Sequence, residues 1–211
     1  SANGVGSWTF DYSGTTLAAG SYQFTAVAAD GAGNSSSASA SFGVTVDTST
    51  PAVSTLNPAD NATGVLPTAN LVLTFDSVVS VQTGNISIRR TSDNALFEQI
   101  PVGDPRVTGS GTTTITINPT ATFTGGVDYY VQIDSTAFDD VAGNGFAGIS
   151  DTTSWSFTTQ TLDLTSSTPA DNATNVALNS AIVLNFNVAA LASGGNIVIR
   201  HSSDDSIFET I

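Results

Sequence analysis

The chain has 211 residues, of which 40% are hydrophobic and only 10% are charged, and 18 acidic side chains against four Arg give a formal net charge of −14. It contains no Cys, which excludes a disulfide framework, a thiolate metal site and a cysteine nucleophile, and no Lys, which excludes a P-loop lysine. A strongly acidic chain without a basic patch also argues against nucleic acid and anionic membrane surfaces as partners.

The sequence shows neither a leader nor a membrane-spanning segment. It has no initiator Met and no basic stretch followed by an apolar one, and its apolar runs are far shorter than the ~18 residues of a membrane helix. The remaining composition is rich in Ser, Thr, Asn and Gly. We therefore expect an internal part of a longer, extracellular bacterial surface protein, with no membrane insertion in this segment.

Residues 1–47 carry the pattern of the end of a β-sandwich. Apolar residues alternate with polar ones along 20–28, and the loop Asp30-Gly-Ala-Gly-Asn34 precedes an apolar run at 42–46. The same order of a Gly–Tyr strand, a D-x-A-G-N loop and a closing strand recurs within residues 126–159. We therefore expect residues 1–47 to be the C-terminal half of a domain, with Trp8 and Phe10 in its core.

Residues 48–160 contain enough strand patterns for one whole domain. Alternating apolar positions occur in three separate runs, at 71–75, 86–88 and 115–117, and the runs are bounded by Gly, Asn, Asp or Pro. No segment of helical length shows a 3.6-residue period. Several short strands in about 110 residues predict a Greek-key β-sandwich.

Residues 161–211 begin a second copy of that domain. Residues 58–100 and 169–211 align without a gap at an offset of 111 positions, with 20 of 43 residues identical. The second copy stops at the position of Ile100, so only its N-terminal half is present. Such a half leaves sheet edges and an apolar face uncovered, and further chain, a partner or a neighbouring copy must complete it.

The motifs of residues 54–159 resemble the bacterial Ig-like domain of S-layer and other surface proteins. They are N-P-A-D-N-A-T-G-V at 57–65, L-V-L-T-F at 71–75, D-V-A-G-N at 140–144 and F-T-T at 157–159. Residues 7–51 resemble a sister type, the tandem Ig-like repeat of large adhesins that includes calcium-dependent repeats-in-toxin adhesins. The resemblance implies an all-β rod of tandem Ig-like domains, one complete and two partial.

Calcium binding is the sharpest chemical hypothesis. Sixteen of the 18 acids are Asp, and Ca²⁺ takes six to eight oxygen ligands from carboxylates, amides and carbonyls. By the resemblance, the D-x-A-G-N loops and the linker at the domain junction hold structural calcium. The alternative is that these side chains cap their own turns by hydrogen bonding. The candidate ligands are Asp30, Asn34 and Asp47, and then Asp139, Asp140 and Asn144.

Catalysis is not expected, and carbohydrate binding is the main rival to a structural role. His201 is the single histidine, its counterpart in the first copy is Arg90, and no G-x-S-x-G motif occurs. Sugar binding needs exposed aromatic platforms. Tyr12, Tyr129 and Tyr130 are candidates, and because the last two are adjacent on a strand, at most one of them should be buried.

We therefore expect a structural or adhesive repeat region of a long secreted surface protein, forming a stalk, layer or extracellular filament. Its partners would be neighbouring domains or copies of the same protein, and cell-surface glycans or a receptor. The alternative is a carbohydrate-binding or accessory module of a secreted polysaccharide-active protein.

Overall fold

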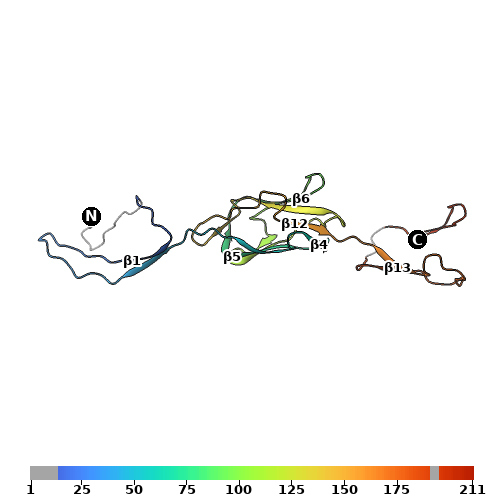
Figure 1. Cartoon of the computed structure of the whole chain (residues 1–211), viewed down its shortest axis with the longest axis horizontal. Coiled ribbons are helices and arrows are strands. Elements are labelled where there is room, and N and C mark those ends of the chain that lie inside the picture. Colours follow the sequence, from blue (N-terminus) through green and yellow to red (C-terminus); the bar gives the residue numbers. More distant parts are fainter. Residues whose placement is uncertain (1–13, 191–194) are drawn as a thin grey trace. The chain divides into compact units, whose positions relative to one another are not determined.

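The computed structural model describes residues 14–190 and 195–211, and these residues form β-strands, turns and loops (Figure 1). The predicted all-β fold class is confirmed. The chain separates into two compact units. The first ends at Thr159, and the second begins at Gln160. The expected core positions Trp8 and Phe10, and the candidate Tyr12, lie outside the described residues. Within those residues there is no helix that is long and apolar enough to cross a membrane.

Residues 14–47 form an extended β-hairpin. Strands β1 (Gly20–Phe24) and β2 (Phe42–Val46) pair antiparallel, with Gly20 opposite Val46 and Phe24 opposite Phe42. Backbone hydrogen bonds continue to the turn at 30–34, where the amide of Asp30 donates to the carbonyl of Asn34 over 2.9 Å. The D-x-A-G-N loop of this segment is therefore the tip of a long hairpin.

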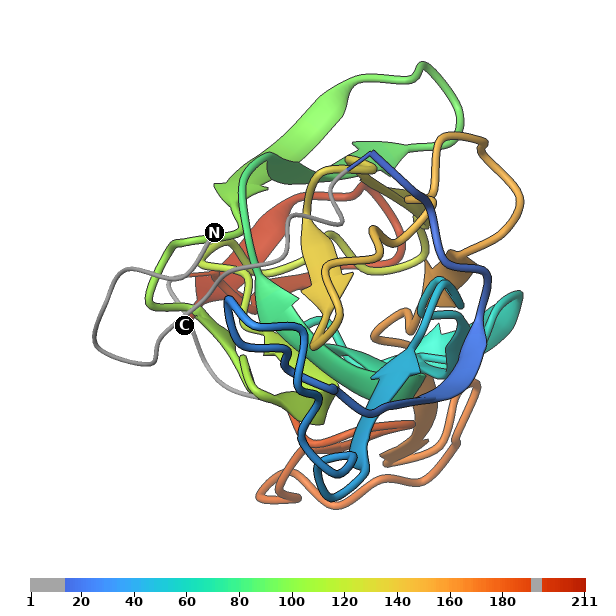
Figure 2. The same ribbon diagram turned by 90° about the vertical axis from the view of Figure 1, so that its left-hand side faces the viewer.

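Residues 53–159 form a β-sandwich, with two sheets facing each other (Figures 1 and 2). One sheet has the order β4-β12-β10-β6-β7, and the other has the order β11-β5-β9-β8 with β3 also paired to β5. The strands are β3 (Val53–Asn57), β4 (Ala62–Val65), β5 (Leu71–Val81), β6 (Asn85–Arg90), β7 (Leu96–Pro101), β8 (Val107–Thr108), β9 (Thr112–Ile117), β10 (Asp128–Ile133), β11 (Phe138–Asp140) and β12 (Ser156–Thr159).

The alternating residues of the sequence fill the space between these sheets. In the first half of β5 the buried positions are Leu71, Leu73 and Phe75, and the intervening residues are more exposed, because successive side chains of a strand point to opposite faces. Trp155 is fully buried, and its indole N–H donates to the carbonyl of Pro58 over 2.8 Å. An aromatic cluster lies beside it, formed by Phe97, Phe123, Tyr129 and Phe157.

The expectation that at most one of Tyr129 and Tyr130 is buried is wrong. Tyr129 is 0% exposed in the core, and Tyr130 is only 3% exposed although it points to the other face of β10. The β6–β7 turn folds over that face, and the Tyr130 hydroxyl donates to the side-chain oxygen of Asn94 over 3.3 Å. The alternation of side chains along β10 therefore did not decide whether Tyr130 is exposed, because the β6–β7 turn covers the outer face of that strand.

Residues 160–211 form two separate antiparallel strand pairs. Strand β13 (Leu164–Thr168) pairs with β14 (Val183–Phe186), and β15 (Val198–Arg200) pairs with β16 (Ile207–Thr210). Nearly all residues of these strands are exposed, apolar ones included. The described residues of this unit, 160–190 and 195–211, therefore form strands but no buried core.

Candidate functional site

The linker of residues 47–52, which joins β2 to β3, is tied to the sandwich that follows it. The side-chain amide of Asn144 donates to the carbonyl of Asp47 over 3.2 Å. At the other end of the linker, the Ala52 amide donates to a carboxylate oxygen of Asp76 over 2.9 Å, and the Asp76 amide donates back to the Ala52 carbonyl over 3.0 Å. Both ends of a six-residue segment are thus held by hydrogen bonds.

The reciprocal pair at Ala52 and Asp76 occurs again 111 positions later. The Asp163 amide donates to the side-chain oxygen of Asn187 over 2.9 Å, and the Asn187 amide donates to the Asp163 carbonyl over 3.0 Å. The side chain changes from Asp to Asn between the two sites, but the accepting oxygen remains. The feature that the two positions share is therefore the accepting side-chain oxygen and not a negative charge.

This comparison predicts the outcome of two substitutions at Asp76. Asp76→Asn should leave the free energy of unfolding within about 0.5 kcal/mol of the parent, because the acceptor is kept, whereas Asp76→Ala should lower it by about 1 kcal/mol. Urea denaturation measures both, and hydrogen exchange at the Ala52 amide should accelerate only in the Ala variant. Equal losses from the two substitutions would show that the carboxylate charge matters.

The D-x-A-G-N loops are closed by their own hydrogen bonds. In one loop, a single Asp140 oxygen accepts the amides of Ala142 (2.9 Å) and Asn144 (2.8 Å), and the second oxygen accepts the Asn144 side-chain amide (3.0 Å). Asp30 makes the same three bonds with Ala32 and Asn34. The hydrogen bonds from the following Asn hold the pKa of each aspartate below its usual value.

The structure groups the predicted metal ligands differently from the sequence prediction. Asp47 lies beside the loop of the following sandwich, where Asn144 contacts it, and Asp140 belongs to that same loop. Asp30 and Asn34 lie instead at the tip of the β1–β2 hairpin, at the end opposite to Asp47. Asp139 faces Ser80 in the β11–β5 ladder and is half-buried.

The aspartate oxygens in these loops are already engaged by hydrogen bonds from the protein. Both oxygens of Asp140 face N–H donors, whereas Ca²⁺ needs oxygen ligands around it. Among residues 14–190 and 195–211 no group of three or more acidic, His or Cys side chains converges. A hollow of about 510 Å³ does lie between Asp47 and Asp140, and the buried hydroxyl of Ser77, which borders it, has no hydrogen-bond partner in the described structure. Calcium binding stays a prediction, and this hollow is where a titration tests it.

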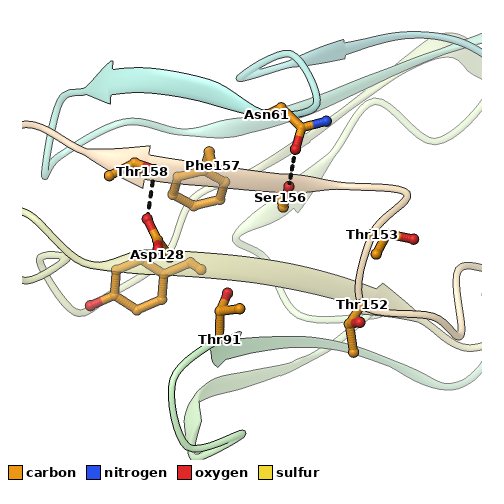
Figure 3. A pocket seen from close by; sticks show the side chains of 9 residues that line it. Asn61, Thr91, Asp128, Thr152, Thr153, Ser156, Phe157 and Thr158 are labelled. Atoms are coloured by element: carbon orange, nitrogen blue, oxygen red, sulfur yellow. Dashed lines mark hydrogen bonds between the residues drawn. The ribbon is translucent and has the colours of Figure 1, made fainter.

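A second hollow, of about 370 Å³, lies along β12 and is lined mainly by hydroxyl groups (Figure 3). Thr158 donates to Asp128 over 2.6 Å, and the hydroxyl of Ser156 lies 3.2 Å from the side-chain oxygen of Asn61. The aromatic residues at this site, Tyr129 and Phe157, are buried and offer no stacking platform. This groove can form hydrogen bonds, but Asp128 is the only charged side chain in its described lining.

One polar network was missed by the sequence analysis. The Glu98 carboxylate accepts the Thr120 and Ala121 amides over 3.1 and 3.3 Å, and it also forms an ion pair with Arg106. Asp104 forms two hydrogen bonds with the same guanidinium, of 2.9 and 3.0 Å, which holds the Asp104 pKa below its usual value. A signal was available, because the only two Glu residues of the chain, 98 and 209, occupy equivalent repeat positions.

Comparison with known proteins accords with this architecture. Residues 47–159, more than half of the chain, match a family model described as a bacterial Ig-like domain, and residues 1–48 match a second model with the same description. The chain belongs to the bacterial Ig-like domain family. Ig-like domain families of this kind are typically non-enzymatic. Membership of the family supports the interpretation of this chain as a repeat region of a surface protein.

Among solved structures, the Ig-like chain is similar to the S-layer protein rSbsC(31-844), with 16% sequence identity and a TM-score of 0.37. The similarity covers 75% of this chain and 22% of the S-layer protein, so the chain spans about a fifth of that relative. Comparison with curated proteins gave no match.

Proposed function

We propose that this chain is a load-bearing repeat region of a long extracellular bacterial surface protein, in which stiff linkers join Ig-like domains into a stalk, layer or filament. The observation that supports this most directly is the linker of residues 47–52. It is short, it is tied to the following sandwich at Asp47 and at Ala52, and the second tie recurs at Asp163. A flexible tether would need none of these contacts.

The hydrogen bonds restrict the linker through their number and their position. Each bond contributes only about 1 kcal/mol, but three bonds at the two ends of a six-residue segment remove most of its freedom to swivel. The Asn144 side chain also donates to Asp140, so the amide group that contacts the linker is held in place by its own loop. The domain therefore presents a preformed seat for the linker that enters it.

The partners in this proposal are neighbouring domains and further copies of the same protein. The net charge of −14 and the exposed carboxylates keep such an array soluble and discourage non-specific association. Calcium at the linker is a separate proposal from the family resemblance. It would use the oxygens of Asp47 and Ser77 at the hollow described above, and it would add to the hydrogen-bonded seat without replacing it.

Replacement of Asn144 by Ala tests the proposed seat. The backbone of residues 47–51 should become more mobile, because the donor to the Asp47 carbonyl is lost, and NMR order parameters measure this directly. Asn34→Ala is the matched control, since it removes the same side chain from the same motif at the hairpin tip, which is the end of the β1–β2 hairpin opposite to Asp47. It should leave residues 47–51 unchanged.

The calcium proposal is tested in the same samples. The difference between the Asn144→Ala variant and the parent should persist after chelation, because the contact is a hydrogen bond between protein groups. If calcium instead raises the melting temperature of the parent, and Asp47→Ala abolishes that rise, then the ion stiffens the linker. Unchanged order parameters in Asn144→Ala would refute the seat itself.

A further inference from the structure

The unit of residues 160–211 exposes a set of apolar side chains along its strands and the segments next to them. Phe208 and Ile211 are each 65% exposed, and Ile182 is 56% exposed. Leu184 and Phe186 in β14, with Ile197 before β15, belong to the same set. An apolar set of this size is costly in water, because each large side chain gains about 1.5–3 kcal/mol from burial.

The complete sandwich shows what covers such a face. The counterparts of these residues, 111 positions earlier, are Leu71, Leu73, Phe75, Ile86, Phe97 and Ile100, and all but the partly buried Phe97 lie in the core. Strand β9 pairs with β5 and places Ile117 opposite Leu71, and β10 pairs with β6. The strands that complete both sheets beside β4, β5 and β6 are β8 to β12, and all of them come from the second half of that sandwich, residues 101–159.

Two polar groups define the partner more narrowly. Glu98 accepts the Thr120 and Ala121 amides and forms an ion pair with Arg106. Asp60 accepts the Ser156 amide over 2.9 Å. Both carboxylates therefore bind the second half of the sandwich. Their counterparts are Glu209 and Asp171, and the Asp171 carboxylate accepts a bond from its neighbour Asn172 over 2.9 Å. The half-domain thus combines apolar surface with two carboxylate acceptors.

We infer that the apolar face of residues 160–211 is a docking surface for a half-domain of the kind formed by residues 101–159. The partner adds one strand beside β14 and another beside β15, in the manner of β9 and β10, and brings a guanidinium to Glu209 and a backbone amide to Asp171. Its apolar side matches the pattern of Ile115, Ile117 and Val131. This inference does not depend on the mechanical function proposed above.

The test uses the full chain with a second copy of residues 101–159 appended directly after Ile211. We expect a second cooperative unfolding transition that the parent chain lacks. We also expect amide exchange in β14 and β15 to slow at least tenfold. Phe186→Asp in the appended chain should abolish both changes and leave the transition of residues 53–159 in place. Leu178→Asp is the control, because this fully exposed residue corresponds to Pro67, outside the core.

Three outcomes would overturn the inference. One is an appended chain in which residues 53–159 unfold normally but no second transition appears. Another is a second transition that survives Phe186→Asp. The third comes from the parent chain, if sedimentation shows that it dimerises and exchange shows that β14 and β15 are already protected in the dimer. In that case the face pairs with a second copy of itself and not with the half-domain proposed.

Discussion

Replacing Trp155 with Ala is expected to lower the free energy of unfolding of the sandwich by about 3–5 kcal/mol. The side chain is fully buried between the sheets, and its removal also leaves the buried carbonyl of Pro58 without the 2.8 Å hydrogen bond that it accepts. Small domains are stable by only about 5–15 kcal/mol, so this change takes away a large share of the total. Urea denaturation followed by circular dichroism measures it.

Trp155→Phe separates the two contributions. Phe retains most of the apolar contact but has no N–H, so the expected loss is about 1–3 kcal/mol, the cost of the unsatisfied carbonyl. A loss in the Phe variant as large as in the Ala variant would mean that the hydrogen bond, and not packing, dominates at this position. A loss below about 1 kcal/mol in both would contradict the core described here.

Gly109→Ala is expected to cost about 3 kcal/mol or more. Gly109 follows β8 with a φ of +101°, and an added Cβ would lie 1.9 Å from the backbone carbonyl oxygen of Thr114. Backbone cannot move aside as a side chain can, so the new methyl group would strain the turn between β8 and β9 in addition to the unfavourable φ. Thermal or urea unfolding of the full chain gives the loss.

Gly111→Ala is the matched control for that substitution. Gly111 lies in the same turn with a φ of +82°, but a Cβ there would meet nothing within 4 Å. Gly111→Ala should therefore lower the free energy of unfolding by only about 1 kcal/mol, because an L residue is disfavoured in a left-handed backbone conformation. Similar losses for the two variants would show that the close approach at Thr114 is not a feature of the folded protein.

The structural role proposed here rests on the junction and not on a pocket. The hollow in Figure 3 offers hydroxyl groups and one carboxylate, and the aromatic candidates for sugar stacking in it are buried. The linker, by contrast, is held at both ends by groups from distant parts of the chain. The arrangement favours a protein whose domains transmit force along their linkers.

The family resemblance, the all-β class and most core positions could be read from the sequence. Alternation at 71–75, 86–88 and 115–117 specified strands with one apolar face, and a gapless repeat specified the copied half-domain. The strand predictions succeeded because they depend on local periodicity, and local periodicity is a property of the chain alone. The D-x-A-G-N motif was likewise visible, as was the alternative that its Asp closes its own turn.

The partners of those residues depended on contacts between positions that are distant in the chain. Asn144 reaches Asp47 across 97 positions, Asp60 reaches Ser156 across 96, and the turn that buries Tyr130 comes from another strand pair. No spacing rule contains such pairs, because sheet order and loop packing decide which segments meet. The sequence therefore determined the all-β fold class and its motifs. The folded chain decided that Asp47 belongs with Asn144 and not with Asp30, because the β1–β2 hairpin holds Asp30 at its far end.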